Sequence, residues 1–281
     1  MPQSMITNIV ARVGLFVLLF WPFPGAAVAD TMLDREQFTG DIGERQSSFL
    51  ALDLTSGARC VLAGSDLETR HAPWSTFKIP NTLIALETGV AESIESWRDW
   101  DPKLRPAAHY WPDAWRQGQT LQSAFQRSAV WYFQDIAVEV GAPRYRDLLS
   151  DWGYGNADVP TGSDTFWLGG PLALSVTEHV HFLERLLTGA LGVDDVHLEA
   201  LTRVAAAGNL GAFKLYGKTG SGPVQAGQFS GSFEGWYAGW LGQYGKVAVV
   251  FAHHAQGAHF SSIRSFRQDF AEVLLKACGY R

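Results

Sequence analysis

A serine and a lysine lie three residues apart within HAPWSTFKIPNTLIALETG, residues 71–89. Apolar residues at helical spacing follow them, so the stretch predicts a helix that begins near Ser75. Side chains three apart on a helix lie on one face, which allows Lys78 to contact Ser75. Because N–H groups at a helix start can hold an oxyanion, this serine could act as a nucleophile with the lysine as its base. Taken alone, the spacing also fits an N-cap serine and a lysine that reaches solvent.

The candidate base carries the wrong charge at neutral pH. A lysine side chain has a reference pKa of about 10.4, and a protonated amine cannot accept the proton of a serine. Burial lowers the pKa of a lysine because apolar surroundings disfavour the charged form, and Trp74, Phe77 and Ile79 supply such surroundings. Chemical modification of Lys78 is the second route to a base.

Four further short segments bear on this choice: SAV at 128–130, YGN at 154–156, FWLGG at 166–170 and KTG at 218–220. Together with STFK at 75–78, and in this order, they resemble the class D (oxacillinase-type) serine β-lactamases. The resemblance covers about residues 40–275. No single segment is specific for that family. All five segments in the family's order, separated by gaps comparable to those of the family, are a specific signal.

The resemblance implies a chemistry for the lysine. In that family this lysine reacts with CO2 to form a carbamate, so Lys78 is expected to be N6-carboxylysine. The carbamate would accept the proton of Ser75 and later activate water. The indole N–H of Trp167, which is a donor only, would hold that anion, and Ser128 would pass a proton to the departing lactam nitrogen. Apart from dissolved CO2 or bicarbonate, no metal or organic cofactor is expected.

Other positions are expected to bind the substrate. Val130 stands where class A enzymes have the amide of S-D-N, which makes the surroundings of the lysine drier. Lys218 would add positive potential, and the hydroxyl of Thr219 would bind a substrate carboxylate. The backbone N–H of Ser221, with that of the nucleophile, would form the oxyanion hole, and Gly220 lets the chain come close to the ligand.

A second cation for the substrate carboxylate is expected at the start of the last helix. Arg264 and Arg267 both qualify, and the resemblance favours Arg267. Tyr154 and Asn156 of the YGN segment are expected to shape the wall of the cleft and to take no part in the chemistry.

Strand patterns occur at both ends of the chain and helical patterns in the middle. Residues 47–54 and 58–64 flank a turn and predict a β-hairpin. From about 90 to 205 the pattern is mostly helical, PAAHYWPDAW (106–115) included, and beyond 210 strand patterns precede one closing amphipathic helix. We predict an α/β fold of the α+β type, with a mixed, mainly antiparallel sheet from both chain ends, flanking helices and an inserted all-helical subdomain. This is the β-lactamase/transpeptidase-like architecture.

The N-terminus is typical of a secretory signal peptide. Arg12 precedes the apolar run VGLFVLLFWPFPGAAVA, which ends in an A-x-A cleavage pattern at Ala29. A membrane anchor needs about 20 continuous apolar residues, and prolines interrupt this run. We predict a signal peptide at 1–29, a catalytic domain at 30–281, and export to a bacterial periplasm or the medium without membrane association after cleavage.

Cys60 and Cys278 are the two cysteines of the sequence. Export would permit a disulfide between them. We nevertheless expect two separate buried thiols, one in a strand and one at the end of the last helix.

Composition and spacing argue against several other functions. The chain has 47% hydrophobic residues, and its net charge of −6 without a Lys/Arg run argues against nucleic-acid binding. HVH at 179–181 resembles part of a zinc motif, but Leu183 occupies the position of the required acid, so we expect no metal site. No G-x-S-x-G elbow is present, which disfavours an α/β-hydrolase esterase.

We therefore predict a β-lactam hydrolase that works through a serine acyl-enzyme. Two competing functions share S-x-x-K and K-T-G: a non-hydrolytic β-lactam sensor domain, and a D-alanyl-D-alanine peptidase or transpeptidase. A sensor should carry transmembrane helices, and a peptidase an added domain or an anchor, and we expect neither. The antibiotic spectrum depends on loops near 105–120 and 223–235, which carry no readable code, and both a monomer and a homodimer are compatible with the sequence.

Overall fold

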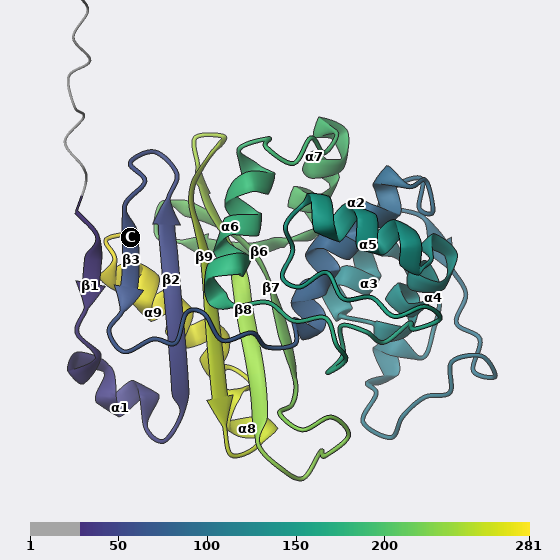
Figure 1. Cartoon of the computed structure of the whole chain (residues 1–281), viewed down its shortest axis with the longest axis horizontal. Helices are drawn as coiled ribbons and strands as arrows, with labels where there is room; N and C mark the ends of the chain where they lie inside the picture. The colour runs from purple at the N-terminus through teal and green to yellow at the C-terminus, as the bar shows by residue number, and fades with distance from the viewer. Residues whose placement is uncertain (1–28) are drawn as a thin grey trace, which may run out of the picture.

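A seven-stranded sheet forms the centre of the computed structural model, which describes residues 29–281 (Figure 1). The predicted signal peptide lies outside this range apart from its last residue, Ala29. The strand order is β1-β3-β2-β9-β8-β7-β6, and only β1 and β3 pair in parallel. The bounds are β1 (Thr31–Leu33), β2 (Gln46–Asp53), β3 (Arg59–Leu62), β6 (Ala206–Leu210), β7 (Phe213–Pro223), β8 (Phe233–Gln243) and β9 (Lys246–Gly257), while β4 (Trp97–Arg98) and β5 (Gln119–Thr120) form a separate pair.

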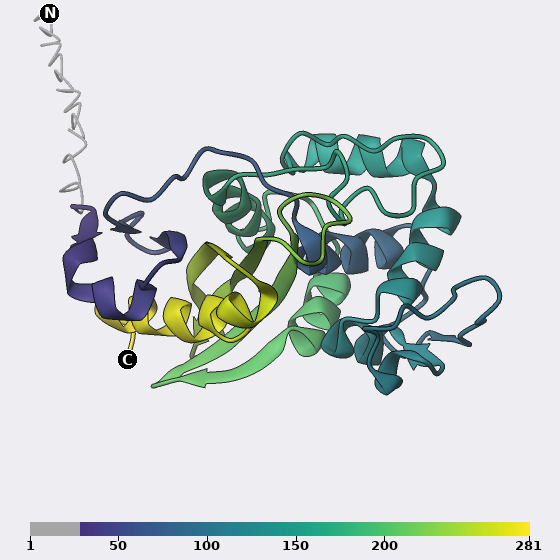
Figure 2. The same ribbon diagram turned by 90° about the horizontal axis from the view of Figure 1, so that it is seen from below.

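Helices cover both faces of the sheet and one end of it. α6 (Val176–Leu187) packs against β2 and β9 on one face, and α9 (Phe266–Ala277) packs against β8 and β9 on the other (Figure 1 and Figure 2). The helices between residues 78 and 151 gather beside β7 as the predicted helical subdomain. The remaining elements are α1 (Thr39–Ile42), α2 (Lys78–Glu87), α3 (Leu121–Arg127), α4 (Val130–Val140), α5 (Ala142–Asp151), α7 (Asp195–Val204), α8 (Phe260–Ile263) and the 3-10 turns η1 (Arg35–Phe38), η2 (Trp74–Phe77) and η3 (Asp113–Trp115). None of the helices in the described range has the length and apolar content that a membrane span requires.

Alternation along the strands builds a core on each face of the sheet. In β8, Trp236, Ala238 and Trp240 face the core under α6, while Tyr237 and Leu241 face the core under α9. Successive side chains of a strand point to opposite faces, so a strand covered on both sides is apolar at nearly every position. This doubly buried strand holds β7, which carries the KTG segment, in a fixed place.

Residues 91–118 depart from the predicted helical middle. They form a loop that contains only η3 and the two-residue strand β4. The prolines of PAAHYWPDAW are the physical reason, because the residue before a proline avoids helical backbone. Pro112 itself is extended, with ψ at 152°. The last predicted helix is also divided in two, α8 and α9, and the short edge strands β1 and β6 were not predicted.

The expectation of two separate thiols is wrong. A disulfide joins Cys60 in β3 to Cys278, the residue after α9, with their Cα atoms 6.0 Å apart. Both side chains lie in or beside the core under α9, because that helix crosses the sheet face on which Cys60 points inward. This proximity depends on tertiary packing between residues 218 positions apart, which the local sequence patterns do not reveal.

Candidate active site

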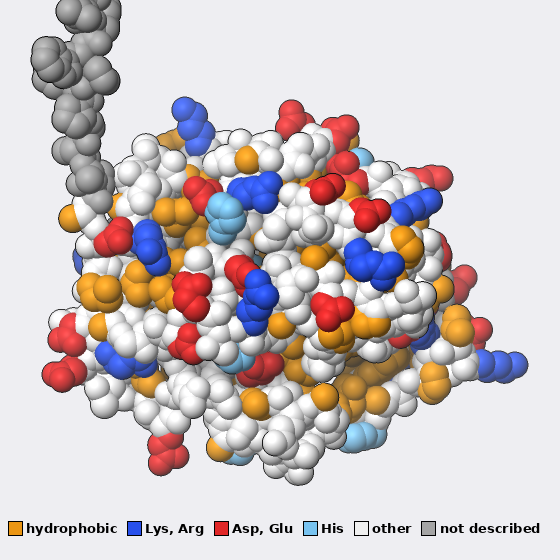
Figure 3. Space-filling model, in the orientation of Figure 1, with side chains coloured by type: hydrophobic (Ala, Val, Ile, Leu, Met, Phe, Trp, Pro, Cys, Tyr) orange, Lys and Arg blue, Asp and Glu red, His pale blue; other side chains and the backbone are white. Residues whose placement is uncertain are grey.

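A cavity of about 710 Å³ lies between the helical subdomain and the loop that joins β7 to β8. Ser75, Ser128, Thr219, Ser221 and Arg267 all line it. In Figure 3, hydrophobic side chains gather in a hollow at the lower right, where these parts of the molecule meet. Aromatic rings supply much of the remaining lining, from Trp74, His109, Tyr110, Trp111, Trp115, Phe229, Phe233 and Phe260. No aspartate or glutamate is among the lining residues of this described part of the chain.

Ser75 and Lys78 meet because a 3-10 turn leads directly into an α-helix. Ser75 lies in η2, and Lys78 is the first residue of α2. Side chains three apart in a 3-10 turn lie one above the other, and Lys78 Nζ donates a hydrogen bond to Ser75 Oγ at 3.0 Å. The lysine is fully buried, with Nζ 5.0 Å from the centre of the Phe133 ring. The contact predicted from the S-x-x-K spacing is therefore present.

Lys78 is buried without an acidic partner. Burial lowers the pKa of Lys78 well below its usual value, and the charge of Lys218 lowers it further. Among the residues that the structure describes, no ion pair involves Lys78. Burial therefore disfavours the ammonium form of Lys78 and shifts it toward the neutral amine, which is the form that can accept a proton or react with CO2.

Trp167 presents a buried donor that lacks a partner. Its indole Nε1 makes no hydrogen bond, although the side chain is fully buried. The ring stacks on Phe77, with centroids 5.3 Å apart, and its backbone carbonyl accepts a hydrogen bond from the N–H of Trp74 at 3.0 Å. Trp167 thus packs against the turn that carries Ser75. An orphaned N–H in a dry setting is costly unless an acceptor faces it.

Ser128 lies at a sharp junction between two helices. A capping box at Thr120 starts α3, and Ser128 ends it in the left-handed conformation, with φ at 62°. Val130 begins α4 and lines the cavity beside Ser128. A non-glycine residue in this backbone region is uncommon and is often found at functional sites. The junction turns Ser128 into the cavity and out of the helix interior.

Strand β7 approaches the turn of Ser75 so closely that only glycine fits. A Cβ atom at Gly220 would lie 2.9 Å from the backbone nitrogens of both Ser75 and Thr76. The backbones of Ser75 and Ser221 consequently border one end of the cavity. An oxyanion hole built from the N–H groups of Ser75 and Ser221 would need such a close approach of the two backbones.

Two further cations lie at the same end. Burial, followed by the charge of Arg267, lowers the pKa of Lys218 to about 7. Arg267 lines the cavity and donates from Nη1 to the carbonyl of Gly220 at 3.0 Å, and burial lowers its pKa to about 10. Arg264 is exposed and does not line the cavity. Of the two arginines considered, the structure places Arg267 at the site.

The YGN segment supports the loop of Trp167. Asn156 Nδ2 donates to the carbonyl of Pro171 at 2.8 Å, and its Oδ1 accepts from the N–H of Ala173 at 3.0 Å. Tyr154 is fully buried and packs on Phe77. Both residues therefore have structural partners and lie outside the cavity lining.

Sequence reasoning missed a group of residues directly behind the nucleophile. Trp74, whose ring lines the cavity, donates from its indole N–H to Glu234 at 2.8 Å, and Glu234 also contacts His71 and His254. The available signal was an acidic residue in the otherwise apolar strand GSFEGWYAGW. A buried acid is rare unless it is paired, so such a residue indicates partners elsewhere in the chain.

Comparison with known proteins agrees with this geometry. The family described as penicillin binding protein transpeptidase domain matches residues 47–274. The chain belongs to this family. Beta-lactamase OXA-10 of Pseudomonas aeruginosa is 38% identical over 175 residues, which are 61% of this chain and 62% of that protein. The matches to the first curated relatives span 62 to 65% of the length of those proteins.

Solved structures of family members share the fold. A class D beta-lactamase, YbXI from Nostoc, has a TM-score of 0.77 at 27% identity, over 88% of this chain and 98% of that one. The C-terminal domain of the BlaR penicillin receptor of Bacillus licheniformis has a TM-score of 0.78 at 25% identity, over 92% and 98% of the two chains. The predicted fold class and the class D resemblance are thereby confirmed, and the similar proteins include a receptor domain as well as β-lactamases.

Proposed function

We propose that the chain hydrolyses β-lactam antibiotics through an acyl-enzyme on Ser75. The observation that carries this proposal is the 3.0 Å contact between Ser75 Oγ and the fully buried Nζ of Lys78. A lysine that burial keeps neutral is a base within reach of the serine proton. The β-lactamases among the similar proteins support the substrate class.

Lys78 is further proposed to carry a carbamate formed with CO2. When present, that group would supply carboxylate-like oxygens that accept the proton of Ser75 and then a proton from water. The unpartnered N–H of Trp167 fits this proposal, because a nearby anion would satisfy it. The positive charge of Lys218 fits it as well, since the same charge that disfavours an ammonium at Lys78 favours an anion there.

The reaction would then follow from the positions of the remaining groups. Ser75 Oγ attacks the lactam carbonyl carbon, and the carbonyl oxygen becomes an anion held by the N–H groups of Ser75 and Ser221. As the C–N bond breaks, the hydroxyl of Ser128 passes a proton to the lactam nitrogen. Attack of water on the resulting ester releases the ring-opened acid and restores Ser75.

The charges around the cavity favour an anionic substrate. Arg267 and the hydroxyl of Thr219 line the cavity and would bind the carboxylate that β-lactam antibiotics carry next to the ring nitrogen, while the buried Lys218 beside Thr219 would add positive potential. The aromatic lining, which includes Trp111, would take an apolar antibiotic side chain.

A β-lactam sensor is the second candidate function, and the structural similarity to the BlaR receptor domain is the observation that favours it. Sensor and enzyme share acylation and differ in whether the ester is hydrolysed. A peptidase or transpeptidase would act instead on D-alanyl-D-alanine peptides.

Nitrocefin turnover with and without bicarbonate distinguishes these functions. We expect steady hydrolysis that becomes biphasic when bicarbonate is withheld, and a carbamate resonance when the active protein takes up 13C-bicarbonate. A single stoichiometric burst would indicate a sensor. Release of D-alanine from a peptide, without antibiotic hydrolysis, would indicate a peptidase. Full turnover without any carbamate resonance would disprove the role given to Lys78.

We also propose that the protein is exported after removal of residues 1–29 and acts without a membrane anchor. Expression of the full sequence in a Gram-negative host should yield a periplasmic protein whose first residue is Asp30. Retention of the uncleaved chain in the membrane fraction would contradict this.

A further inference from the structure

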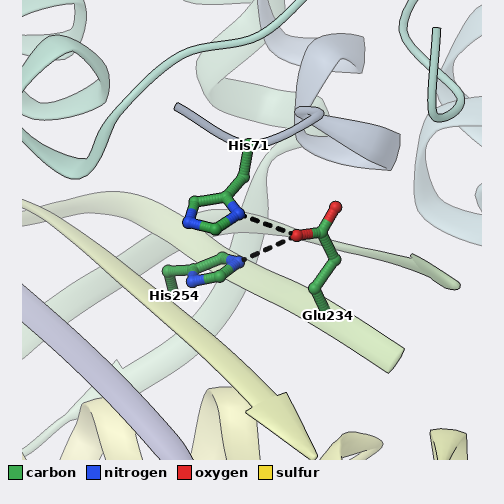
Figure 4. Close-up of side chains that lie close together, drawn as sticks. All are labelled: His71, Glu234 and His254. Atoms are coloured by element: carbon green, nitrogen blue, oxygen red, sulfur yellow. Dashed lines mark hydrogen bonds and ion pairs between the residues drawn. The ribbon is translucent and has the colours of Figure 1, made fainter. Parts of the chain in front are cut away.

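A buried carboxylate lies directly behind the nucleophile. Glu234 projects from β8 and is 6% exposed. Its Oε1 accepts a hydrogen bond from the indole N–H of Trp74 at 2.8 Å. Its Oε2 lies 2.9 Å from Nδ1 of His71 and 3.4 Å from Nε2 of His254, as Figure 4 shows. The mechanism proposed above uses none of these four residues.

Glu234 is ionised throughout the working range of pH. Burial opposes its ionisation, but the contacts with His254, His71 and Trp74 outweigh burial and lower the pKa of Glu234 to about 2. A carboxylate only accepts hydrogen bonds, so the nitrogens that face it must carry their protons. Two N–H groups, those of Trp74 and His71, thus donate to one buried anion, and hydrogen bonds to an ionised acceptor are stronger than those between neutral groups.

The two histidines and the glutamate also have the residue types of a metal site. The geometry argues against that use. The rings of His71 and His254 stack with their centroids 3.9 Å apart and their planes 22° from parallel. The lone pairs of nitrogens in nearly parallel rings do not converge, whereas a metal ion must lie close to the plane of each imidazole that binds it. The same near-parallel planes keep the two rings from both donating in plane to one oxygen. His71 Nδ1 bonds to Oε2 of Glu234 at 2.9 Å, whereas His254 Nε2 lies 3.4 Å from it without a hydrogen bond.

Trp74 connects this carboxylate to the active site. It directly precedes Ser75, and its backbone is left-handed, with φ at 52°. Its ring occupies the space that a side chain would need at Gly222 in β7 and at Gly169 in the loop of Trp167, with the nearest ring atoms 2.1 Å and 2.9 Å from those Cβ positions. The indole therefore fills the gap between the KTG strand and the FWLGG loop.

Independent bonds fix the chain just before Trp74, at His71 and Ala72. Trp236, two residues after Glu234, donates from its indole to the carbonyl of Ala72 at 2.9 Å. The backbone of His71 pairs with Leu174. A left-handed backbone is unfavourable for a non-glycine residue, and the packing of the Trp74 ring and the hydrogen bond of its indole N–H offset that cost. The bond to Glu234 is the polar contact that holds the indole.

We propose that Glu234, buttressed by His71 and His254, is a positioning residue for Ser75 that acts through the indole of Trp74. The inference rests on the proposed function for its kinetic readout, because acylation is the step that needs the hydroxyl in place. Glu234 itself touches neither the substrate nor the reacting atoms.

A double-mutant cycle on acylation tests this route. Glu234→Gln keeps the size and an acceptor but removes the charge, and Trp74→Phe keeps the ring but removes the donor. Each single change should lower the acylation rate constant for a fluorescent penicillin about 10- to 100-fold, with little effect on the dissociation constant of the pre-covalent complex. The double variant should be no slower than the slower single variant, because both changes break one bond.

Glu87→Gln is the matched control. Glu87 contacts His197 at 2.6 Å in a second carboxylate–histidine pair that does not line the cavity. The acylation rate of the Glu87→Gln variant should equal that of the unmodified protein. Additive effects in the cycle, or single variants that acylate normally, would overturn the positioning role. Stoichiometric Zn2+ binding that Glu234→Gln abolishes would overturn it too and assign a metal site.

A spectroscopic readout separates this inference from the proposed function. The indole 1H–15N resonance of Trp74, assigned from its loss in Trp74→Phe, should lie downfield and move upfield in Glu234→Gln as the charged acceptor disappears. An unchanged resonance would disprove the Glu234–Trp74 coupling. A protein that takes no β-lactam label but shows this shift would refute the proposed function alone.

Discussion

At the scale of single residues, the site is built from basic side chains that have no acidic partner in the described part of the chain. Arg267 lines the cavity, while the buried Lys78 contacts the lining residue Ser75 and the buried Lys218 precedes the lining residue Thr219. No ion pair of the described residues involves any of these three basic residues. Burial is the main cause that lowers the pKa of Lys78 and of Lys218, and the charge of Lys218 lowers the first further, as the charge of Arg267 does the second. Anions relieve this repulsion, so a substrate carboxylate, an oxyanion and a carbamate would all be stabilised here.

Lys218 should give substrate binding a pH dependence. Its pKa of about 7 leaves it charged at lower pH and neutral at higher pH, whereas Arg267, with a pKa of about 10, stays charged across this range. In bicarbonate-free buffer, the dissociation constant of the pre-covalent penicillin complex should therefore rise about tenfold as the pH passes 7. Stopped-flow measurements of acylation at several penicillin concentrations between pH 5.5 and pH 9 would give this dissociation constant.

Bicarbonate should move the rise in the dissociation constant, here called the transition, to higher pH. An anion at Lys78 favours the charged form of Lys218, so Lys218 would keep its proton to a higher pH. The exposed Lys246 provides the control. Lys246→Ala should keep the transition and Lys218→Ala should remove it. The same transition in Lys218→Ala would contradict the assignment.

Trp167→Phe should separate the two stages of turnover. Phenylalanine keeps the stacking on Phe77 but removes the unpartnered N–H, so a carbamate at Lys78 would lose its donor. Deacylation should slow roughly 10- to 100-fold while acylation persists, which lets the acyl-enzyme accumulate and become visible by mass spectrometry. Saturating bicarbonate should restore part of the rate. Normal deacylation in this variant would remove the role given to Trp167.

The extent to which the site was predictable depends on sequence distance. Ser75 and Lys78 are three residues apart, so helical geometry alone predicts their contact. The ordered segments predicted that Ser128 and Thr219 share the cavity. Glu234 and Trp74 are 160 residues apart and belong to no recognised segment, so only the folded chain shows their bond.

At the scale of elements, β7 and η2 approach each other more closely than side chains would allow. Gly220 faces the backbone at Ser75, and Gly222 faces the ring of Trp74. The strand pattern of AFKLYGKTG (212–220) predicts β7 but not this approach, since glycines in a strand also mark bulges and turns. The hydrophobic pattern predicted the buried strands correctly, because burial requires an apolar residue at nearly every position. It predicted a helix wrongly in the loop of Pro112, because the prolines there prevent helical backbone.

Gly222→Ala should displace the nucleophile without touching it. The added Cβ would lie 2.1 Å from the ring of Trp74, and Glu234 restrains that ring from swinging away. Overpacking of this kind costs about 1–3 kcal/mol, so the melting temperature and the acylation rate should both fall. Gly231→Ala is the matched control, because its Cβ would meet only the carbonyl of Gln228 at 3.6 Å. Equal acylation in the two variants would contradict the close approach.

At the scale of the whole molecule, the two ends of the chain close one sheet. β2 pairs with β9 along eight residues, and the disulfide then ties β3 to the residue after α9. β2, β9 and β8 separate β3 from β7, so the crosslink lies well away from the cavity (Figure 1). The crosslink therefore bears on the stability of the sheet and not on the geometry of catalysis.

Replacement of both Cys60 and Cys278 by serine should lower stability and leave the chemistry intact. The bond closes a loop of 218 residues, and a crosslink of this kind typically contributes about 2–4 kcal/mol by restricting the unfolded chain. For a domain of this size, that corresponds to a fall in melting temperature of roughly 4–16 °C.

Calorimetry of the oxidised, the reduced and the doubly substituted protein would measure the fall, and the last two should agree. Nitrocefin hydrolysis at 25 °C should match in all three, since η2, β7 and the helical subdomain keep their contacts without the bond. Loss of hydrolysis by a protein that is still folded would show that the far edge of the sheet shapes the active site after all.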